Sequence, residues 1–153
     1  MGVRVAIAIG SNLGERESHL DFARSRLRAL LSDLRASTSR ETAPVGMPGD
    51  QRPFLNAALV GTTSMTPPEL LAELLGIESE RGRERPFPGA ARTLDLDLVL
   101  FGDHVVNEPG LIVPHPRFRE RKFVLEPLVE IAPCLRDPVT GRTVKELLNL
   151  VIG

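Results

Sequence analysis

A strictly alternating segment constrains the fold of this chain more than any other part of the sequence. Residues 93–101 read TLDLDLVLF, in which leucines alternate with two aspartates. Because successive side chains of a β-strand point to opposite faces, we predict a strand with one apolar face in the core. Asp95 and Asp97 are expected to share the opposite face, about 7 Å apart along the strand. The predicted apolar face consists of Leu94, Leu96, Leu98 and Leu100.

The two aspartates predict a cation site. Two carboxylates held close together on one strand face repel each other unless a cation lies beside them. Magnesium prefers such oxygen ligands and completes its coordination with phosphate oxygens and water. An ordinary solvent-facing strand is the alternative, but aspartate is depleted in strands and two at alternate positions are unusual. We therefore favour a magnesium site at Asp95 and Asp97.

Basic side chains gather on both sides of the aspartate pair along the chain. Arginine presents a planar fork of donors that suits phosphate oxygens, and its combination with two carboxylates is typical of phosphoryl transfer. Any one of these arginines alone is better explained as part of a solvated loop. The sequence contains no Walker A motif, so a bound nucleotide would not occupy a P-loop. The two basic groups are Arg81, Arg83, Arg85 and Arg92, followed by Arg117, Arg119, Arg121 and Lys122.

The order of the predicted elements is that of a ferredoxin-like domain. An apolar stripe predicts a helix over residues 20–34, and the capping box of Thr66 and Glu69 predicts the start of a second helix. Together with the strands, these helices give the order βαββαβ, an α+β ferredoxin-like sandwich that we expect to form one domain over residues 1–153. The predicted strands lie at residues 3–9, 37–42, 54–63 and 93–101.

C-terminal additions are predicted after this unit. Residues 104–107 are expected to form an edge strand, and residues 111–121 a loop broken by prolines. Residues 123–131 fit a short helix. Thr143 and Glu146 form a second capping box, which predicts a last helix that ends near residue 151.

Composition limits the class of protein and its location. The chain has 153 residues with a formal net charge of -1, which argues against a protein that grips long nucleic acid by bulk charge. It has one cysteine and no apolar run long enough for a signal peptide or a membrane span. We therefore expect a cytoplasmic monomer that binds neither nucleic acid nor membrane.

Five segments, in order and spacing, resemble the 6-hydroxymethyl-7,8-dihydropterin pyrophosphokinase family. The resemblance covers nearly the whole chain, and the RTLDLD block is its most specific part. It implies a ferredoxin-like fold and the transfer of diphosphate from ATP to 6-hydroxymethyl-7,8-dihydropterin, giving AMP and the pterin diphosphate, in folate synthesis. The five segments are GSNLG at 10–14, FLNAA at 54–58, RTLDLD at 92–97, VPH at 113–115 and PLVEIAP at 127–133.

The resemblance also implies a role for each matching position. Asp95 and Asp97 would hold two magnesium ions that bridge the triphosphate. Arg83 and Arg92 match catalytic arginines that help to position ATP. The other positions that match the nucleotide site are Glu78, Arg85, His115 and Arg121. The positions that match the pterin pocket are Thr42, Val45, Phe54, Asn56 and Phe123.

Two other functions remain as alternatives at this point. Another magnesium-dependent phosphoryl or nucleotidyl transferase on the same fold would also use the aspartate pair and the arginines. A non-catalytic ferredoxin-like module that binds nucleic acid would stack bases on exposed strand aromatics. The chain has six phenylalanines, no tyrosine and no tryptophan, which disfavours that module. A sensor domain without catalysis would not need the two aspartates.

Overall fold

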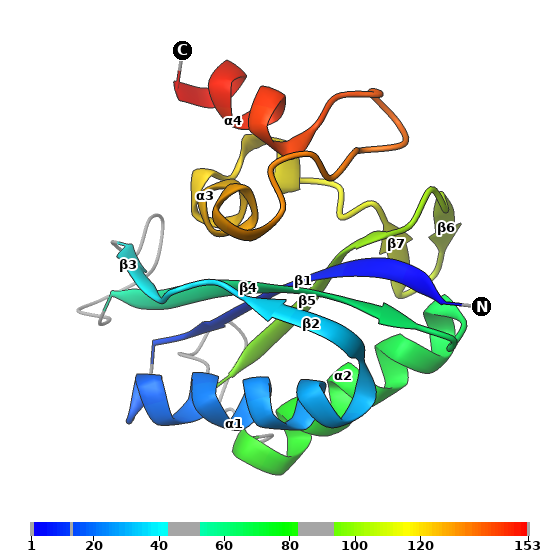
Figure 1. Ribbon diagram of the computed structural model, residues 1–153. Helices are drawn as coiled ribbons and strands as arrows, with labels where there is room; N and C mark the ends of the chain where they lie inside the picture. The colour runs from blue at the N-terminus through cyan, green and yellow to red at the C-terminus, as the bar shows by residue number, and fades with distance from the viewer. Residues whose placement is uncertain (1, 13, 43–52, 83–93, 153) are drawn as a thin grey trace.

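A central antiparallel sheet organises the chain (Figure 1). The computed structural model describes residues 2–12, 14–42, 53–82 and 94–152. The five strands of the sheet are β1 (Val3–Ser11), β2 (Ser32–Ala36), β3 (Arg40–Thr42), β4 (Phe54–Thr63) and β5 (Asp95–Phe101). Their order is β2-β4-β1-β5, with β3 also paired to β4, and all pairings are antiparallel. With one helix after β1 and another after β4, this order confirms the predicted ferredoxin-like α+β fold.

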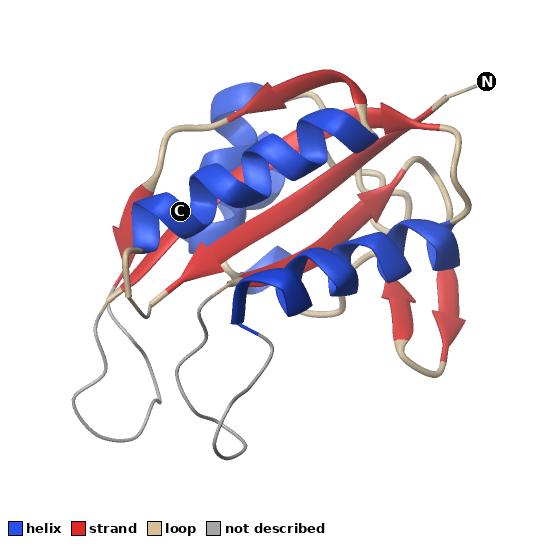
Figure 2. Ribbon diagram, turned by 90° about the horizontal axis from the view of Figure 1, so that it is seen from below, coloured by secondary structure: helices blue, strands red, loops and turns tan. Residues whose placement is uncertain are grey.

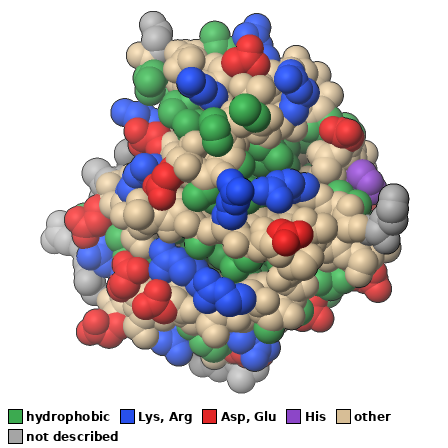
Figure 3. Space-filling view, viewed as in Figure 1, with side chains coloured by type: hydrophobic (Ala, Val, Ile, Leu, Met, Phe, Trp, Pro, Cys, Tyr) green, Lys and Arg blue, Asp and Glu red, His purple; other side chains and the backbone are tan. Residues whose placement is uncertain are grey.

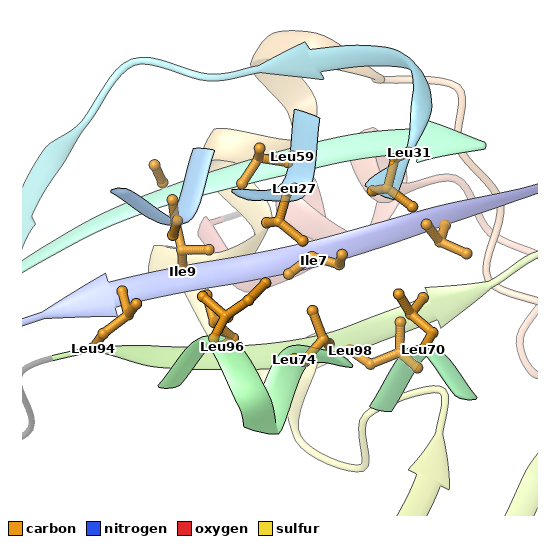
Figure 4. Close-up of a cluster of buried hydrophobic side chains, with 14 of the residues drawn as sticks. Ile7, Ile9, Leu27, Leu31, Leu59, Leu70, Leu74, Leu94, Leu96 and Leu98 are labelled. Carbon is orange, nitrogen blue, oxygen red and sulfur yellow. The ribbon is translucent and has the colours of Figure 1, made fainter. Parts of the chain in front are cut away.

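Helices α1 (Arg16–Leu30) and α2 (Pro67–Gly82) cover one face of the sheet (Figure 2). The predicted capping box starts α2: the Thr66 backbone N–H donates to Glu69 Oε1 at 2.8 Å, and the Glu69 N–H donates to Thr66 Oγ1 at 3.3 Å. Apolar side chains fill the space between helices and sheet (Figure 4). Complete burial of each such leucine or isoleucine contributes roughly 1.5–3 kcal/mol. Members of this cluster include Ile7, Ile9, Leu27, Leu59, Leu70, Leu74, Leu94, Leu96 and Leu98.

The C-terminal additions cover much of the opposite face of the sheet (Figure 1). They include α3 (Lys122–Ile131), which packs on β4, and α4 (Val144–Ile152), which packs on α3 and η1. The predicted capping box of Thr143 and Glu146 forms at the start of α4, with reciprocal bonds of 2.9 and 3.1 Å. The small side chains of Ala6 and Ala58 belong to the apolar cluster on this face, where they let α3 approach the sheet closely.

Strands β6 (Val106–Glu108) and β7 (Leu111–Val113) form a separate hairpin, and the 3-10 helix η1 spans Phe118–Glu120. The edge strand predicted at residues 104–107 is therefore displaced by one or two residues. The loop predicted at 111–121 is interrupted by β7 and η1.

A β-bulge divides β5 into two parts. The pairing steps from Ile7 opposite Leu98 to Ala6 opposite Leu100, so Val99 is an extra residue. The three leucines before the bulge belong to the core under α1 and α2, whereas Leu100 belongs to the core under α3 and α4. The prediction that Leu100 shares a face with the other leucines is therefore wrong, because an extra residue moves every later side chain to the opposite face.

The second strand begins earlier than the sequence pattern predicts. Helix α1 runs from Arg16 to Leu30, and β2 starts at Ser32, so the predicted helix over 20–34 begins and ends four residues too late. The predicted strand over 37–42 is confirmed only at residues 40–42, which form β3; residues 37–39 are not in a strand, and a further strand lies at 32–36. Pairing with β4, in which Arg35 lies opposite Val60, decides the structure here, because tertiary contacts override the local helical period.

The surface carries charges of both signs. Among the described residues on the face seen in Figure 3, acidic and basic side chains are interspersed, with no continuous block of positive charge. Such a face does not offer the basic stripe that tracks a nucleic acid backbone. Across the described ranges, no helix has both the length and the apolar character needed to cross a bilayer.

Candidate active site

A cavity of about 590 Å³ opens between the sheet and the start of α3. The sheet contributes the ends of β1, β3, β4 and β5, and α3 contributes its first turns. Seven of the predicted site residues meet around this cavity, although they are spread over more than eighty positions of the chain. These seven residues are Thr42, Phe54, Asn56, Asp95, Asp97, Arg121 and Phe123.

The aspartate pair lies on the face of β5 that was predicted for it. Leu94, Leu96 and Leu98 are buried on the side of α1 and α2, which leaves Asp95 and Asp97 half-buried at the cavity. No cluster of three or more acidic, histidine or cysteine side chains that could enclose a metal occurs within the described residues. Two carboxylates fit magnesium nonetheless, because magnesium takes one or two protein carboxylates and obtains its other ligands from phosphates and water.

Asn56 is fixed at the floor of the cavity by its neighbours. Its Nδ2 donates a hydrogen bond of 2.7 Å to Thr42 Oγ1, which joins β4 to β3. Its Oδ1 lies over Gly10, where an added Cβ would approach that oxygen to 3.0 Å. Gly10 therefore leaves room for the amide, and the bond to Thr42 orients its oxygen as an acceptor.

Two aromatic side chains face the cavity from different layers. Phe54 lies on β4 and is half-buried, whereas Phe123 lies on α3 and is 39% exposed. The Arg121 guanidinium stands 5.6 Å from the centroid of the Phe123 ring. An apolar ring is therefore available on the sheet side and another on the helix side, which suits a flat heterocycle.

A second, smaller cavity of about 240 Å³ lies at the edge of the sheet, beside the hairpin of β6 and β7. Its lining includes Asp97, Leu98, Ile112 and His115. The Val99 carbonyl at the bulge accepts a hydrogen bond of 3.0 Å from the His115 backbone N–H, which anchors this wall to β5. Asp97 lines both cavities and therefore marks the place where their contents would meet.

His115 is held as a neutral ring. The Arg117 backbone N–H donates to His115 Nδ1 at 3.2 Å, so the neutral ring carries its proton on Nε2. Burial is the main cause that lowers the pKa of His115, and the positive charges of Arg121 and Arg117 lower it further. The carboxylate of Asp95 acts in the opposite direction but does not outweigh them. At neutral pH, His115 can therefore donate a hydrogen bond from Nε2 without carrying a charge.

We expect the ring of His115 to titrate below the ordinary histidine value of about 6.5. Asp95→Asn should lower this pKa further, because it removes the charge that raises it. Between about pH 6.5 and the lower pKa of the folded state, the unfolded chain binds a proton at His115 that the folded chain does not bind. The free energy of unfolding therefore decreases as the pH is lowered through this range. NMR titration of the His115 ring, assigned by comparison with His115→Gln, measures the effect. A titration midpoint above 6.5 would contradict it.

Glu78 lies in neither of these two cavities. Its Oε2 accepts a hydrogen bond of 2.7 Å from the backbone N–H of Leu96, the residue between the two aspartates. The carboxylate therefore fastens β5 to α2 at the point from which Asp95 and Asp97 project. Whether it also contacts a nucleotide, as the resemblance implies, stays a prediction.

Of the five basic residues in these groups that the structure describes, three form hydrogen bonds or ion pairs with other side chains. Arg119 donates to the buried Asp137, and Arg117 pairs with Glu120 at 3.5 Å. Arg81 donates to His19 Nδ1 and to Ser18 Oγ, each at 2.9 Å. From the second basic group, Arg121 and Lys122 line the larger cavity. The predicted site residues Val45, Arg83, Arg85 and Arg92 lie outside the described residues.

Sequence reasoning missed several residues that line the larger cavity. Ala8 and Gly10 come from β1, Glu41 from β3, and Glu126 from α3. The alternation of β1 could have placed Ala8 and Gly10 on one face. The positions of Glu41 and Glu126 depend on how β3 and α3 pack, and no local pattern marks them.

The sequence matches one protein family over most of its length. Residues 6–133 match the family described as 7,8-dihydro-6-hydroxymethylpterin-pyrophosphokinase. A Bacillus subtilis relative named 2-amino-4-hydroxy-6-hydroxymethyldihydropteridine pyrophosphokinase is 46% identical over 137 residues, which is 88% of this chain and 81% of the relative. A Pseudomonas aeruginosa relative with the same name is 40% identical over 147 residues, covering 95% of this chain and 90% of the relative.

Solved structures share the fold. A crystal structure of Plasmodium falciparum HPPK-DHPS superposes with a TM-score of 0.78 at 13% identity, over 98% of this chain and 45% of that one. At this identity the likeness concerns the fold. The chain thus spans less than half of that solved chain. It also spans only 20% of Pneumocystis carinii folic acid synthesis protein fol1, to which it is 38% identical over 149 residues.

Proposed function

The chain belongs to the 7,8-dihydro-6-hydroxymethylpterin-pyrophosphokinase family, and from that membership we propose how its two cavities divide the substrates. The protein is an ATP-dependent pyrophosphokinase of folate biosynthesis. The observation that carries the proposal is the position of Asp97, which lines both cavities. We propose that the pterin occupies the larger cavity, ATP extends from the smaller one, and the reacting atoms meet at the aspartate pair.

The chemistry of the larger cavity suits the pterin. Its volume of about 590 Å³ accommodates a bicyclic heterocycle together with part of a triphosphate. Phe54 and Phe123 offer apolar surfaces for the ring, and the Asn56 amide oxygen offers an acceptor for its N–H groups. Because Thr42 occupies the Asn56 Nδ2 donor, the amide cannot turn freely to suit another pattern of hydrogen bonds.

The smaller cavity suits the nucleotide. His115 can donate to a phosphate or ribose oxygen, and Ile112 and Leu98 offer apolar surface for a base. Asp95 and Asp97 would hold magnesium, for which we propose two ions, and magnesium there would neutralise charge on the triphosphate oxygens. By the family resemblance, Arg83 and Arg92 would add positive charge around the transferred group, while Arg85 and Glu78 would support the nucleotide.

The reaction that the family resemblance implies fits this placement. The hydroxymethyl oxygen of the pterin forms a bond to the β-phosphorus, and the bond from that phosphorus to the α–β bridging oxygen breaks. AMP leaves with the bridging oxygen, and the pterin hydroxyl loses its proton to solvent. Asn56 and the two phenylalanines fix the pterin, and Arg121 at the cavity wall stabilises the negative charge of the moving diphosphate. We also propose that the protein acts as a cytoplasmic monomer in which residues 1–153 form one domain.

The product nucleotide tests this reaction. With ATP, magnesium and 6-hydroxymethyl-7,8-dihydropterin, we expect AMP to appear in step with the pterin diphosphate when nucleotides are resolved by chromatography. In an ordinary kinase the acceptor oxygen attacks the γ-phosphorus, and the product nucleotide would be ADP instead.

The control is the same mixture without pterin, in which little AMP should form. Release of ADP, or AMP formation that does not depend on the pterin, would refute the assignment and favour another phosphoryl or nucleotidyl transferase.

A further inference from the structure

We propose that Arg16, at the start of α1, is a positioning residue for the pterin cavity. Its guanidinium fastens together the two strand ends that carry Thr42 and Phe54. This inference rests on the proposed function, because it takes the larger cavity to be the pterin site. Arg16 does not line that cavity and therefore acts through other residues.

The contacts of Arg16 join two separate segments. Nη2 lies 2.6 Å from Glu41 Oε1 on β3, and Nη1 donates at 2.7 Å to the backbone carbonyl of Pro53, just before β4. Glu41 directly precedes Thr42, and Pro53 directly precedes Phe54. The planar guanidinium of Arg16 therefore links Glu41 and Pro53, the residues directly before the two cavity residues Thr42 and Phe54.

The strand ends need such a clamp because their own pairing is short. Strand β3 has three residues, and Thr42 opposite Phe54 is the last pair of its ladder with β4. The hydrogen bond from Asn56 to Thr42 spans the same two strands on the cavity side. If β3 shifts, Thr42 moves, and the Asn56 amide loses the partner that fixes its orientation.

Burial separates Arg16 from an ordinary surface arginine. The Arg16 side chain is 18% exposed, whereas Arg26 on the same helix is 49% exposed and pairs with Glu80. A positive charge in the first turn of a helix is also disfavoured by the helix dipole. Because the helix dipole destabilises the positive charge of Arg16, we infer that the contacts with Glu41 and Pro53 offset this cost.

The matched variants are Arg16→Met, which keeps a long apolar stem but removes the fork, and Arg26→Met as a control on the same helix. We expect Arg16→Met to weaken pterin binding about tenfold in the presence of a non-hydrolysable ATP analogue and magnesium. The dissociation constant of the nucleotide should change less than about twofold, a difference worth only a few tenths of a kcal/mol. Arg26→Met should leave both constants unchanged, since exposed pairs contribute little.

The outcomes separate a positioning role from general stabilisation. Arg16→Lys, which keeps the charge and one hydrogen bond, should recover part of the pterin affinity. It also provides the test if Arg16→Met does not fold, because it should then bind pterin more weakly than the unmodified chain. Unchanged pterin binding in the folded variants, or equal weakening of both substrates, would overturn the proposal.

One further variant keeps this test distinct from the proposed function. Asn56→Ala removes an amide from the cavity itself and should weaken pterin binding if the cavity is the pterin site. If Asn56→Ala binds pterin normally, the assignment of the cavity is wrong. If Asn56→Ala binds pterin more weakly and Arg16→Met binds it normally, the assignment of the cavity to the pterin is kept and only the role of Arg16 is rejected.

Discussion

Replacing Asp97 by asparagine is expected to lower the rate of diphosphate transfer at least about a hundredfold, the typical loss when one electrostatic contact at the reacting group is removed. Asp97 lines both cavities, and in the proposed function its carboxylate would hold magnesium next to the phosphate oxygens. The amide has the same shape, so the strand and its leucine face should remain intact. The measurement is kcat at saturating ATP, pterin and magnesium, with magnesium-dependent binding of an ATP analogue determined by calorimetry.

Asp103→Asn provides the control for this change. Asp103 lies just beyond the end of β5, is exposed, and lines neither of the two cavities. It should retain normal turnover and magnesium dependence. Near-normal kcat in Asp97→Asn at saturating magnesium would show that the aspartate pair does not hold the metal.

Replacing Asp137 by alanine is expected to lower the free energy of unfolding by about 3–5 kcal/mol, the usual cost of breaking a buried ion pair from one side. The Asp137 side chain is fully buried and accepts two hydrogen bonds from Arg119, at 2.6 and 3.1 Å. Thr140 Oγ1 and the Val139 backbone N–H also donate to it. The alanine variant leaves the Arg119 guanidinium without its partner. Denaturant unfolding followed by circular dichroism measures the loss.

The pH dependence of this ion pair has a definite sign. Burial raises the pKa of Asp137, but hydrogen bonds from Arg119, Thr140 and Val139 outweigh it, so the pKa is lowered. Its stabilising contribution is therefore complete above the ordinary aspartate pKa and is lost as the pH falls through the lower folded value. Glu120→Ala is the control, because its pair with Arg117 is exposed and should contribute less than about 1 kcal/mol. Equal losses for Asp137→Ala and Glu120→Ala would contradict the account.

Elements with strong local signals were predicted well from the sequence. The two capping boxes start α2 and α4 where expected, and β4 occupies the predicted residues 54–63. The errors occur where pairing between distant strands decides the structure. Strand β2 forms at 32–36 because it pairs with β4, although Leu31 and Leu34 continue the helical pattern of α1. No local pattern contains that information.

The candidate site shows the same division. Asp95 and Asp97 could be assigned to one face because their strand alternates, and the structure places them at the cavity. The family resemblance led to Asn56 and Phe123; from the residue pattern alone, Asn56 is better explained as a structural polar residue and Phe123 as a core residue. No local sequence pattern marks Arg16, because its proposed positioning role depends on contacts with Glu41 and Pro53, which are 25 and 37 positions away.

The bulge at Val99 has a consequence for how β5 can vary between related proteins. On one side of it the strand directs Asp95 and Asp97 to the cavity, and on the other it directs Leu100 to the core under α3 and α4. Exchanging one apolar side chain for another preserves both directions, and so would deleting Val99, because regular alternation then places Leu100 on the face opposite Leu98. A related sequence can therefore lose the bulge when β5 shortens by one residue, whereas a regular strand of the same length would turn Leu100 toward the core under α1 and α2.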